Sequence, residues 1–316
     1  MLNGIHHITS LASDPQRNVD FYVDVLGLRL VKRTVNFDAP DVYHLYYGDE
    51  SGHPGTVLTF FPFPDAARGK RGTREISAVA FTVPERAMDF WINRISQRGL
   101  RFEGPETRFD EQVMAFEDPD GMRVELVFAE APSGHRHWPS SSVPKEFGIE
   151  RFHGATITLA RRGETDRLLR EVLGFQSIGQ SGQRFRYSIG EGPAKATIDI
   201  VENPALPAAR QSAGSVHHIA WRVADDASQQ AWKQKLADDG VYTTAVLDRN
   251  YFRSIYFREP GGVLFEIATD TPGFTVDEPL DELGLHLKLP AWLEQERRKL
   301  ERILPPIELK IRETVL

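Results

Sequence analysis

Two pairs of adjacent histidines are the residues in this chain best suited to chemistry. His6–His7 lies in the segment GIHHIT near the start, and His217–His218 lies in the similar segment VHHIA much further along. A neutral imidazole is a common transition-metal ligand, and imidazole also carries protons near neutral pH. Because both pairs open strand-like segments, we expect the chain to repeat a unit and to bring the two copies together.

A carboxylate on a second apolar strand supplies a third candidate ligand. Glu266 stands in the run VLFEI at 263–267, whose other side chains predict a buried strand. A buried carboxylate is costly unless it is paired or bound to a cation. Two imidazoles and one carboxylate match the facial triad of non-haem Fe(II) enzymes, whose other positions stay open for substrate and oxygen. Zn(II) and Mn(II) also accept these donors, so the set alone does not name the metal.

Strand geometry divides the members of each pair. Alternation points His6 and His7, and likewise His217 and His218, to opposite faces of a sheet. At most one histidine of each pair can therefore point straight into a shared cavity, unless a bulge intervenes. A lone pair of strand histidines is more often satisfied by hydrogen bonds than by a metal, so the duplication is what favours a metal site.

The elements that must position these side chains follow one order, strand–helix–strand–strand–strand, four times. Apolar periodicity and Gly/Pro punctuation predict the order in each copy. First strands are expected at 4–12, 76–83, 151–159 and from 215, and helices at 14–26, 84–98, 164–172 and 227–238. The other strands are expected at 29–37, 42–48, 56–63, 100–108, 112–117, 122–129, 175–179, 184–189, 195–202, 241–247, 252–258 and 263–269.

The pattern predicts an α+β fold of four tandem βαβββ modules that form two half-barrel-paired domains. We expect these domains at 1–135 and 136–275, joined by a polar, proline-bearing linker at 131–145. A C-terminal extension at 276–316 is expected to carry a charged surface helix at 293–303. Modules one and four are expected to share the metal site.

The internal repeat serves as a control on the candidate ligands. Glu125 of module two aligns with Glu266 of module four, but Ser77 and Ala78 replace the histidines of its first strand. Module three keeps only one of the two histidines, His153. Because neither module has the full set, we expect Glu125 and His153 to be structural.

Composition narrows the class of protein. The 316 residues have a net charge of −7 and contain no cysteine, which excludes disulfides, thiolate metal sites and cysteine nucleophiles. No basic face stands out, so nucleic acid is not an expected partner. Neither a secretory leader nor a membrane-spanning apolar run is evident, so we expect a soluble, cytoplasmic protein that does not bind membranes. A homo-oligomer is also expected.

Several motifs carry a resemblance to a known family. They are IHHIT at 5–9, Gly27, VKRT at 31–34, YHLY at 43–46, PGT at 54–56, the histidines at 217–218, Arg249, Tyr256, PGG at 260–262, the Phe–Glu at 265–266 and GLHLK at 284–288. In these motifs the chain resembles the vicinal oxygen chelate (glyoxalase/extradiol dioxygenase) superfamily. More narrowly it is similar to the hydroquinone ring-cleaving dioxygenases, including the 2,6-dichlorohydroquinone 1,2-dioxygenases.

The resemblance implies Fe(II) bound by His7, His218 and Glu266. It also implies that five further residues lie near the bound metal and ring: Tyr256 as a proton donor or acceptor, and around it Arg249, Thr9, His6 and His217. Strand parity leaves open whether His6 and His217 line the pocket or brace the barrel from its outer face.

Three of the polar candidates also have a purely structural interpretation. Tyr256 could pack in the core as a strand aromatic, and Arg249 could be a loop cation paired with a surface carboxylate. His44 is expected to be structural, because it lies on a middle strand.

The expected function is an Fe(II)-dependent extradiol-type dioxygenase that cleaves a hydroquinone or a related dihydroxy-aromatic with O2. A glyoxalase-like lyase or isomerase is one alternative, but that class commonly has four protein ligands and only three are visible. A metal-free drug-sequestering protein of the same fold is another, although it would not need two histidines and Glu266.

Overall fold

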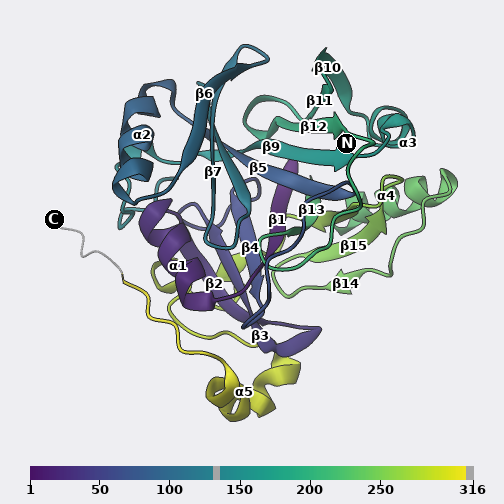
Figure 1. Cartoon of the computed structure of the whole chain (residues 1–316). Coiled ribbons are helices and arrows are strands. Elements are labelled where there is room, and N and C mark those ends of the chain that lie inside the picture. The colour runs from purple at the N-terminus through teal and green to yellow at the C-terminus, as the bar shows by residue number, and fades with distance from the viewer. Residues whose placement is uncertain (131–135, 311–316) are drawn as a thin grey trace.

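The computed structural model describes residues 1–130 and 136–310, and within them two sheets of eight strands dominate (Figure 1). The first sheet has the order β14-β15-β16-β13-β1-β4-β3-β2, and the second has the order β10-β11-β12-β9-β5-β8-β7-β6. The strands of the first sheet are β1 (Ile5–Ala12), β2 (Arg29–Asn36), β3 (Ala39–Gly48), β4 (Val57–Pro62), β13 (Val216–Val223), β14 (Leu247–Asp248), β15 (Arg253–Arg258) and β16 (Leu264–Thr269). Those of the second are β5 (Glu75–Val83), β6 (Phe102–Arg108), β7 (Glu111–Glu117), β8 (Arg123–Phe128), β9 (Arg151–Leu159), β10 (Gln176–Ser181), β11 (Arg184–Ile189) and β12 (Ala196–Glu202).

The sheets confirm the predicted fold class and its modular order. Modules one and four form the first sheet, joined where β1 pairs antiparallel with β13, and modules two and three form the second, joined at β5 and β9. Each sheet therefore crosses the expected sequence division into 1–135 and 136–275, and that division stays a prediction. Its boundary, with the part of the expected linker at 131–135, lies outside the described residues.

The module helices form close to their predicted positions. They are α1 (Pro15–Val19), α2 (Met88–Gln97), α3 (Gly163–Arg167) and α4 (Asp226–Asp238). Asp14 and Asp225 cap α1 and α4, because their side chains accept hydrogen bonds from the amides of Arg17 and Ser228. α1 and α3 each continue into a π-helical turn, at Asp20–Val25 and Leu168–Val172, so modules one and three share this irregularity.

Two predicted elements differ from the structure. The strand expected at 241–247 is reduced to the two residues of β14. The hydroxyls of Thr243 and Thr244 bond to neighbouring backbone carbonyls there, and such local bonds compete with a sheet ladder. The tail helix expected at 293–303 begins instead as a 3₁₀ helix, Ala291–Glu296, and becomes α-helical only in α5 (Arg297–Ile303).

Bulges interrupt the central strand pairs at matching places. Between β1 and β13 the register skips His6 on one strand and His217 on the other. Between β5 and β9 it skips Ser77 and His153. A bulge inserts one unpaired residue and shifts the alternation of side chains, so the first histidine of each pair is the inserted residue.

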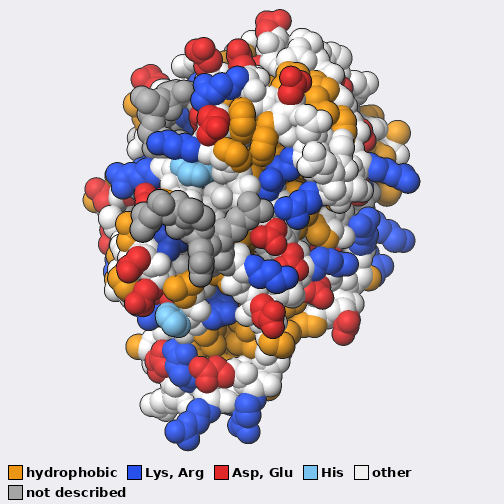
Figure 2. All heavy atoms as spheres, turned by 90° about the vertical axis from the view of Figure 1, so that its left-hand side faces the viewer, with side chains coloured by type: hydrophobic (Ala, Val, Ile, Leu, Met, Phe, Trp, Pro, Cys, Tyr) orange, Lys and Arg blue, Asp and Glu red, His pale blue; other side chains and the backbone are white. Residues whose placement is uncertain are grey.

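The surface has the mixed character expected of the composition. On the face shown in Figure 2, basic and acidic side chains intermingle, with apolar side chains between them. Within the described residues, no helix is long and apolar enough to cross a membrane.

Candidate metal centre

Three side chains from adjacent strands converge at the middle of the first sheet. Nε2 of His7 on β1 lies 3.2 Å from Nε2 of His218 on β13. Oε2 of Glu266 on β16 lies 3.3 Å from the first nitrogen and 2.8 Å from the second. All three residues are buried. Within the part of the chain that the structure describes, this is the one group of three or more His, Cys, Asp or Glu side chains that could hold a metal ion.

The spacing of these three atoms allows them to bind one shared metal ion. Two donors about 2.1 Å from an ion and at right angles to one another lie about 3 Å apart. The three observed separations bracket that value. Oε1 of Glu266 accepts a hydrogen bond from the hydroxyl of Ser254, whereas Oε2 is buried and accepts no well-aligned hydrogen bond. The oxygen without such a bond is the one that faces the two imidazoles.

The bulged histidines contact the two candidate ligand histidines. Nδ1 of His6 lies 2.9 Å from Nδ1 of His7, and Nδ1 of His217 lies 2.8 Å from Nδ1 of His218. If His7 and His218 each donate their Nδ1–H to the neighbouring histidine, their Nε2 lone pairs are free to bind a metal. Ligand histidines characteristically donate their other N–H in this way.

The cluster contains a fully buried, ionised carboxylate. Burial alone would raise the pKa of Glu266, but His7 and His218 hold this pKa well below its usual value. Burial, followed by the neighbouring His218, lowers the pKa of His217 to about 3, and burial also lowers the pKa of His218 and of His6. A buried carboxylate is costly unless a cation or an ion pair compensates its charge. The donor set therefore fits a divalent metal ion.

Tyr256 and Arg249 lie beside the cluster. Tyr256 pairs in register with Glu266, and its ring centre lies 5.5 Å from that of His218. Burial and the charge of Glu266 raise the pKa of Tyr256. Nε of Arg249 donates to the Tyr256 hydroxyl at 3.4 Å, and its Nη1 also pairs with Asp38 at 3.1 Å. Arg249 thus joins a surface carboxylate and the site, so both readings of this residue describe part of its contacts.

Thr9 completes the predicted set. It pairs in register with His218, and its hydroxyl lies 2.8 Å from the hydroxyl of Thr59. The structure therefore brings all eight predicted residues into one region of the first sheet.

The structure also adds residues that the sequence did not indicate. Ser254 supports Glu266, as described above, and its position two residues before Tyr256 on a strand is the signal that could have revealed it. Phe252 packs against both His6 and His7, with ring centres 5.1 Å and 4.8 Å away. Phe252 had no comparable signal, because a strand-end phenylalanine is ordinary core material.

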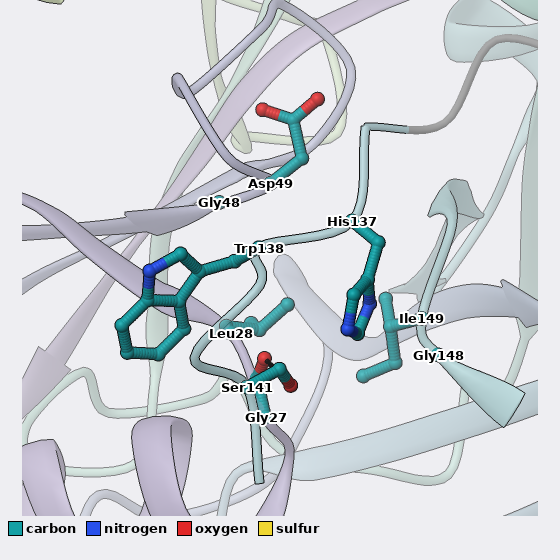
Figure 3. A pocket seen from close by; sticks show the side chains of 9 residues that line it. All are labelled: Gly27, Leu28, Gly48, Asp49, His137, Trp138, Ser141, Gly148 and Ile149. Carbon is teal, nitrogen blue, oxygen red and sulfur yellow. Dashed lines mark hydrogen bonds between the residues drawn. The ribbon is translucent and has the colours of Figure 1, made fainter. Parts of the chain in front are cut away.

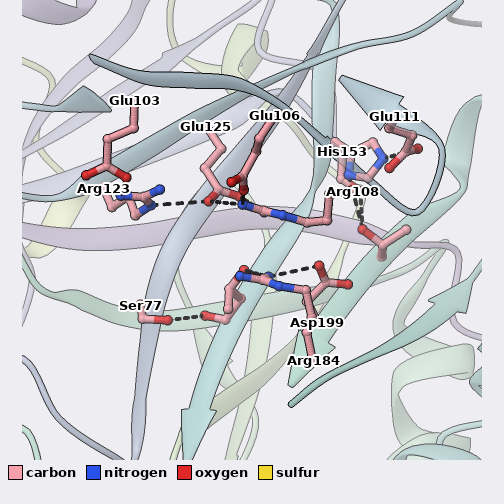
Figure 4. Close-up of polar contacts among 12 residues, drawn as sticks. Ser77, Glu103, Glu106, Arg108, Glu111, Arg123, Glu125, His153, Arg184 and Asp199 are labelled. Atoms are coloured by element: carbon pink, nitrogen blue, oxygen red, sulfur yellow. Dashed lines mark hydrogen bonds and ion pairs between the residues drawn. The ribbon is translucent and has the colours of Figure 1, made fainter. Parts of the chain in front are cut away.

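In the second sheet, charged side chains pair with Glu125, the counterpart of Glu266 (Figure 4). Nη1 of Arg108 lies 2.8 Å from Oε2 of Glu125, and Arg123 lies 3.2 Å from the other oxygen. Burial would raise the pKa of Glu125, but these arginines lower it. His153 pairs instead with Glu111 at 2.8 Å. These contacts support the structural reading of Glu125 and His153.

Two of the hollows in the described part of the chain lie away from the cluster and differ greatly in size. A small cavity of about 10 Å³ is lined in part by Asp49, His137 and Trp138 (Figure 3). A wider hollow of about 970 Å³ lies against the first residues of the chain and α4, with Trp232 and Lys235 in its lining. None of the three candidate ligands lines either hollow, so the candidate site rests on converging side chains.

In sequence, the chain is similar to proteins that are named as ring-cleaving dioxygenases. The chain is 43% identical over 307 residues to MhqO of Bacillus subtilis (strain 168), a candidate ring-cleaving dioxygenase, and the match spans 97% of both chains. It is 38% identical over 313 residues to the chlorohydroquinone/hydroquinone 1,2-dioxygenase of Sphingobium indicum, over 96% of both chains.

Structural comparison and a family model extend the result over most of the chain. A crystal structure of a candidate dioxygenase from Bacillus subtilis superposes with a TM-score of 0.94 at 42% identity, covering 98% of this chain and 99% of the other. The model of the Glyoxalase/Bleomycin resistance protein/Dioxygenase superfamily matches residues 4–126 and 167–267. The chain therefore belongs to that superfamily, as its histidine, glycine and glutamate motifs predicted.

Proposed function

We propose that this protein is an Fe(II)-dependent, extradiol-type dioxygenase that cleaves the ring of a hydroquinone or a related dihydroxy-aromatic. The observation that carries the proposal is the buried cluster of His7, His218 and Glu266, which offers three donor atoms, one of them from a fully buried carboxylate. Its relatives support the reaction class, because one of them is named a chlorohydroquinone/hydroquinone 1,2-dioxygenase.

The three donors would hold the metal and leave its remaining positions open. When bound there, Fe(II) would act as a Lewis acid toward a phenolic oxygen and pass electron density to O2. His6 and His217 would fix the ring orientation of the two histidine ligands through their Nδ1 contacts. Ser254 would hold the far oxygen of the Glu266 carboxylate.

Tyr256 is suited to donate a proton or hydrogen bond. Arg249 donates its Nε–H to the phenol oxygen of Tyr256, so the phenol's own hydrogen is free to reach another oxygen. The raised pKa keeps this phenol protonated at neutral pH. We therefore assign Tyr256 as a proton donor to a substrate oxygen and Arg249 as the residue that positions it.

The test is oxygen consumption after anaerobic reconstitution with Fe(II). We expect hydroquinone, substituted hydroquinones or catechol to cause O2 uptake with loss of aromatic absorbance, and His218→Ala to abolish both. Absence of uptake across the whole panel would count against the proposal. Turnover of a methylglyoxal–thiol adduct, or stoichiometric drug binding, would instead support one of the two alternatives.

We also propose that the chain forms a homo-oligomer, with a small aromatic compound and O2 as its substrates. Light scattering of the purified protein measures its mass directly. A monomer across a range of concentrations would contradict the first part without affecting the proposed reaction.

A further inference from the structure

Modules one and four repeat each other within the first sheet, and the repeat gives Glu266 a counterpart. Tyr256 faces Glu266 across the β15–β16 pair, and Tyr46 faces Thr59 across the β3–β4 pair. The late strands β4 and β16 run parallel to the first strands β1 and β13, which carry the ligand histidines. Thr59 therefore occupies in module one the place that Glu266 occupies in module four.

The polar contacts behind these two positions correspond as well. Two residues before Tyr256, Ser254 donates its hydroxyl hydrogen to Glu266. Two residues before Tyr46, His44 places Nε2 at 2.9 Å from Oγ1 of Thr59. Both threonine and glutamate are fully buried. The repeat has thus kept a supported polar group at both positions but has replaced the carboxylate of one by a hydroxyl.

His44 holds the Thr59 hydroxyl between two further groups. Nδ1 of His44 lies 2.8 Å from the hydroxyl of Tyr46, and Oγ1 of Thr59 lies 2.8 Å from that of Thr9. If Tyr46 donates to His44, the other ring nitrogen donates to Thr59. A hydroxyl has one hydrogen and two lone pairs, so Thr59 could then accept from His44 and still donate. Burial, followed by His7 and His218, lowers the pKa of His44, which keeps its ring neutral.

We infer that Thr59 marks the side of the metal site that the protein leaves open, and that its hydroxyl hydrogen-bonds to the substrate oxygen bound there. His44 is a positioning residue that acts through this hydroxyl. The inference rests on the proposed function for the identity of the substrate, whereas the placement of Thr59 rests on the repeat alone.

The replacement also sets the charge that the site offers to a substrate. A divalent ion with the single carboxylate of Glu266 leaves one positive charge, which suits a singly ionised phenol. A second carboxylate at residue 59 would cancel this charge and occupy the open position. The hydroxyl of Thr59 therefore favours an anionic oxygen ligand, because it adds a donor without adding negative charge.

Thr59→Glu tests the placement without measuring turnover. We expect this variant to melt at a lower temperature than the wild type without metal, because it buries a carboxylate. Mn(II) or Zn(II) should then raise its Tm more than they raise that of the wild type. Competition with a chelator should give a metal Kd at least about tenfold lower, as expected for an added charged ligand. Anaerobic calorimetry should show loss of hydroquinone binding.

Thr34→Glu is the matched control for the buried charge. Thr34 is fully buried, and its hydroxyl has no hydrogen-bond partner. It lies on β2 in register with His44, and β3 separates it from Thr59 on β4. We expect Thr34→Glu to lower Tm without strengthening the response to metal. Equal metal responses in the two variants, or a response of Thr59→Glu no larger than that of the wild type, would overturn the placement.

Conservative variants test the hydroxyl and its support. Calorimetry of hydroquinone binding to anaerobic, Mn(II)-loaded protein should show about tenfold weaker binding for Thr59→Val, and recovery for Thr59→Ser. His44→Phe should weaken binding similarly, and His44→Gln should restore part of it, while Thr34→Val leaves it unchanged. Wild-type affinity in Thr59→Val would overturn the hydroxyl's role. Tighter metal binding by Thr59→Glu without any phenol turnover in the wild type would contradict only the proposed function.

Discussion

Neighbouring histidines divide the tasks of the site. His7 and His218 present Nε2 to the cluster, whereas His6 and His217 bond to the opposite ring nitrogens. A ligand ring that is free to turn would lose alignment each time it rotated, so a fixed Nδ1 contact preorganises the lone pair. Placing the support next to the ligand in sequence ensures that a single bulge positions both.

Glu266→Gln should separate metal binding from folding. The change removes the only carboxylate of the three-donor cluster but keeps its shape and a group that Ser254 can contact. We expect a metal-free Tm equal to or above that of the wild type, because a costly buried carboxylate is removed. The rise in Tm on adding Mn(II) should disappear, with metal affinity lowered roughly 100-fold or more. A metal-dependent rise of wild-type size would contradict the assignment of Glu266 as a ligand.

At the scale of elements, the bulges decide what strand parity leaves open. An ideal strand would send His6 and His7 to opposite faces. Strand parity alone therefore does not decide whether His6 lines the site or faces outward. In the structure, a one-residue bulge on each central strand brings both rings to the same side. The type of residue does not reveal where the bulge lies, because a serine, Ser77, is the inserted residue in the second sheet.

The three residues of the cluster could be predicted from sequence, because a buried carboxylate and repeated histidine pairs are visible there. Glu266 stands out among apolar neighbours, and the repeated pairs identify His7 and His218. The contacts of Ser254 with Glu266 and of Thr59 with His44 could not be predicted, because buried hydroxyls are common on strands and their partners depend on the register. The shortened β14 was also missed, because local threonine bonds compete with pairing only once the edge of the sheet is known.

The second sheet allows a prediction at the same scale. Glu125→Gln breaks the buried pair with Arg108 and leaves that guanidinium with less compensating charge. We expect a loss of about 3 kcal/mol in the free energy of unfolding, measured with urea. Metal affinity should stay at the wild-type value, because Glu125 lies in the other sheet. Loss of metal binding with unchanged stability would show that the roles of Glu125 and Glu266 had been confused.

At the scale of the whole molecule, one short loop of the second sheet joins it to the helix of module one. Oδ2 of Asp118 accepts a hydrogen bond from the hydroxyl of Tyr22 at 2.9 Å. Asp120 accepts bonds from Ser13 and pairs with Arg17 at 2.9 Å. This loop lies between β7 and β8, and Tyr22 lies in the helical turn that leads from β1 to β2. The joint therefore links the sheet that holds the candidate ligands to the sheet that does not.

Asp118 makes this joint sensitive to pH. Its side chain is buried and also accepts hydrogen bonds from the backbone amides of Asp120 and Met122. Burial outweighs these contacts and raises the pKa of Asp118 from 3.8 to about 6. The folded state thus holds its proton more tightly than the unfolded state does. The stability from this group is fully present below the unfolded pKa and is lost as pH rises through about 6.

Asp118→Asn isolates that contribution, because an amide keeps the shape and a carbonyl that can accept both backbone bonds. We expect the variant's unfolding free energy, relative to the wild type, to increase by about 2 kcal/mol between about pH 4.5 and 7.5, since each unit of pKa shift is worth about 1.4 kcal/mol. Urea denaturation at several pH values measures this difference. Tyr22→Phe removes a donor to the charged carboxylate, so it should raise the pKa of Asp118 further and extend the loss of stability to higher pH. A difference between Asp118→Asn and the wild type that does not change with pH would show that Asp118 is ionised in the folded protein throughout this range.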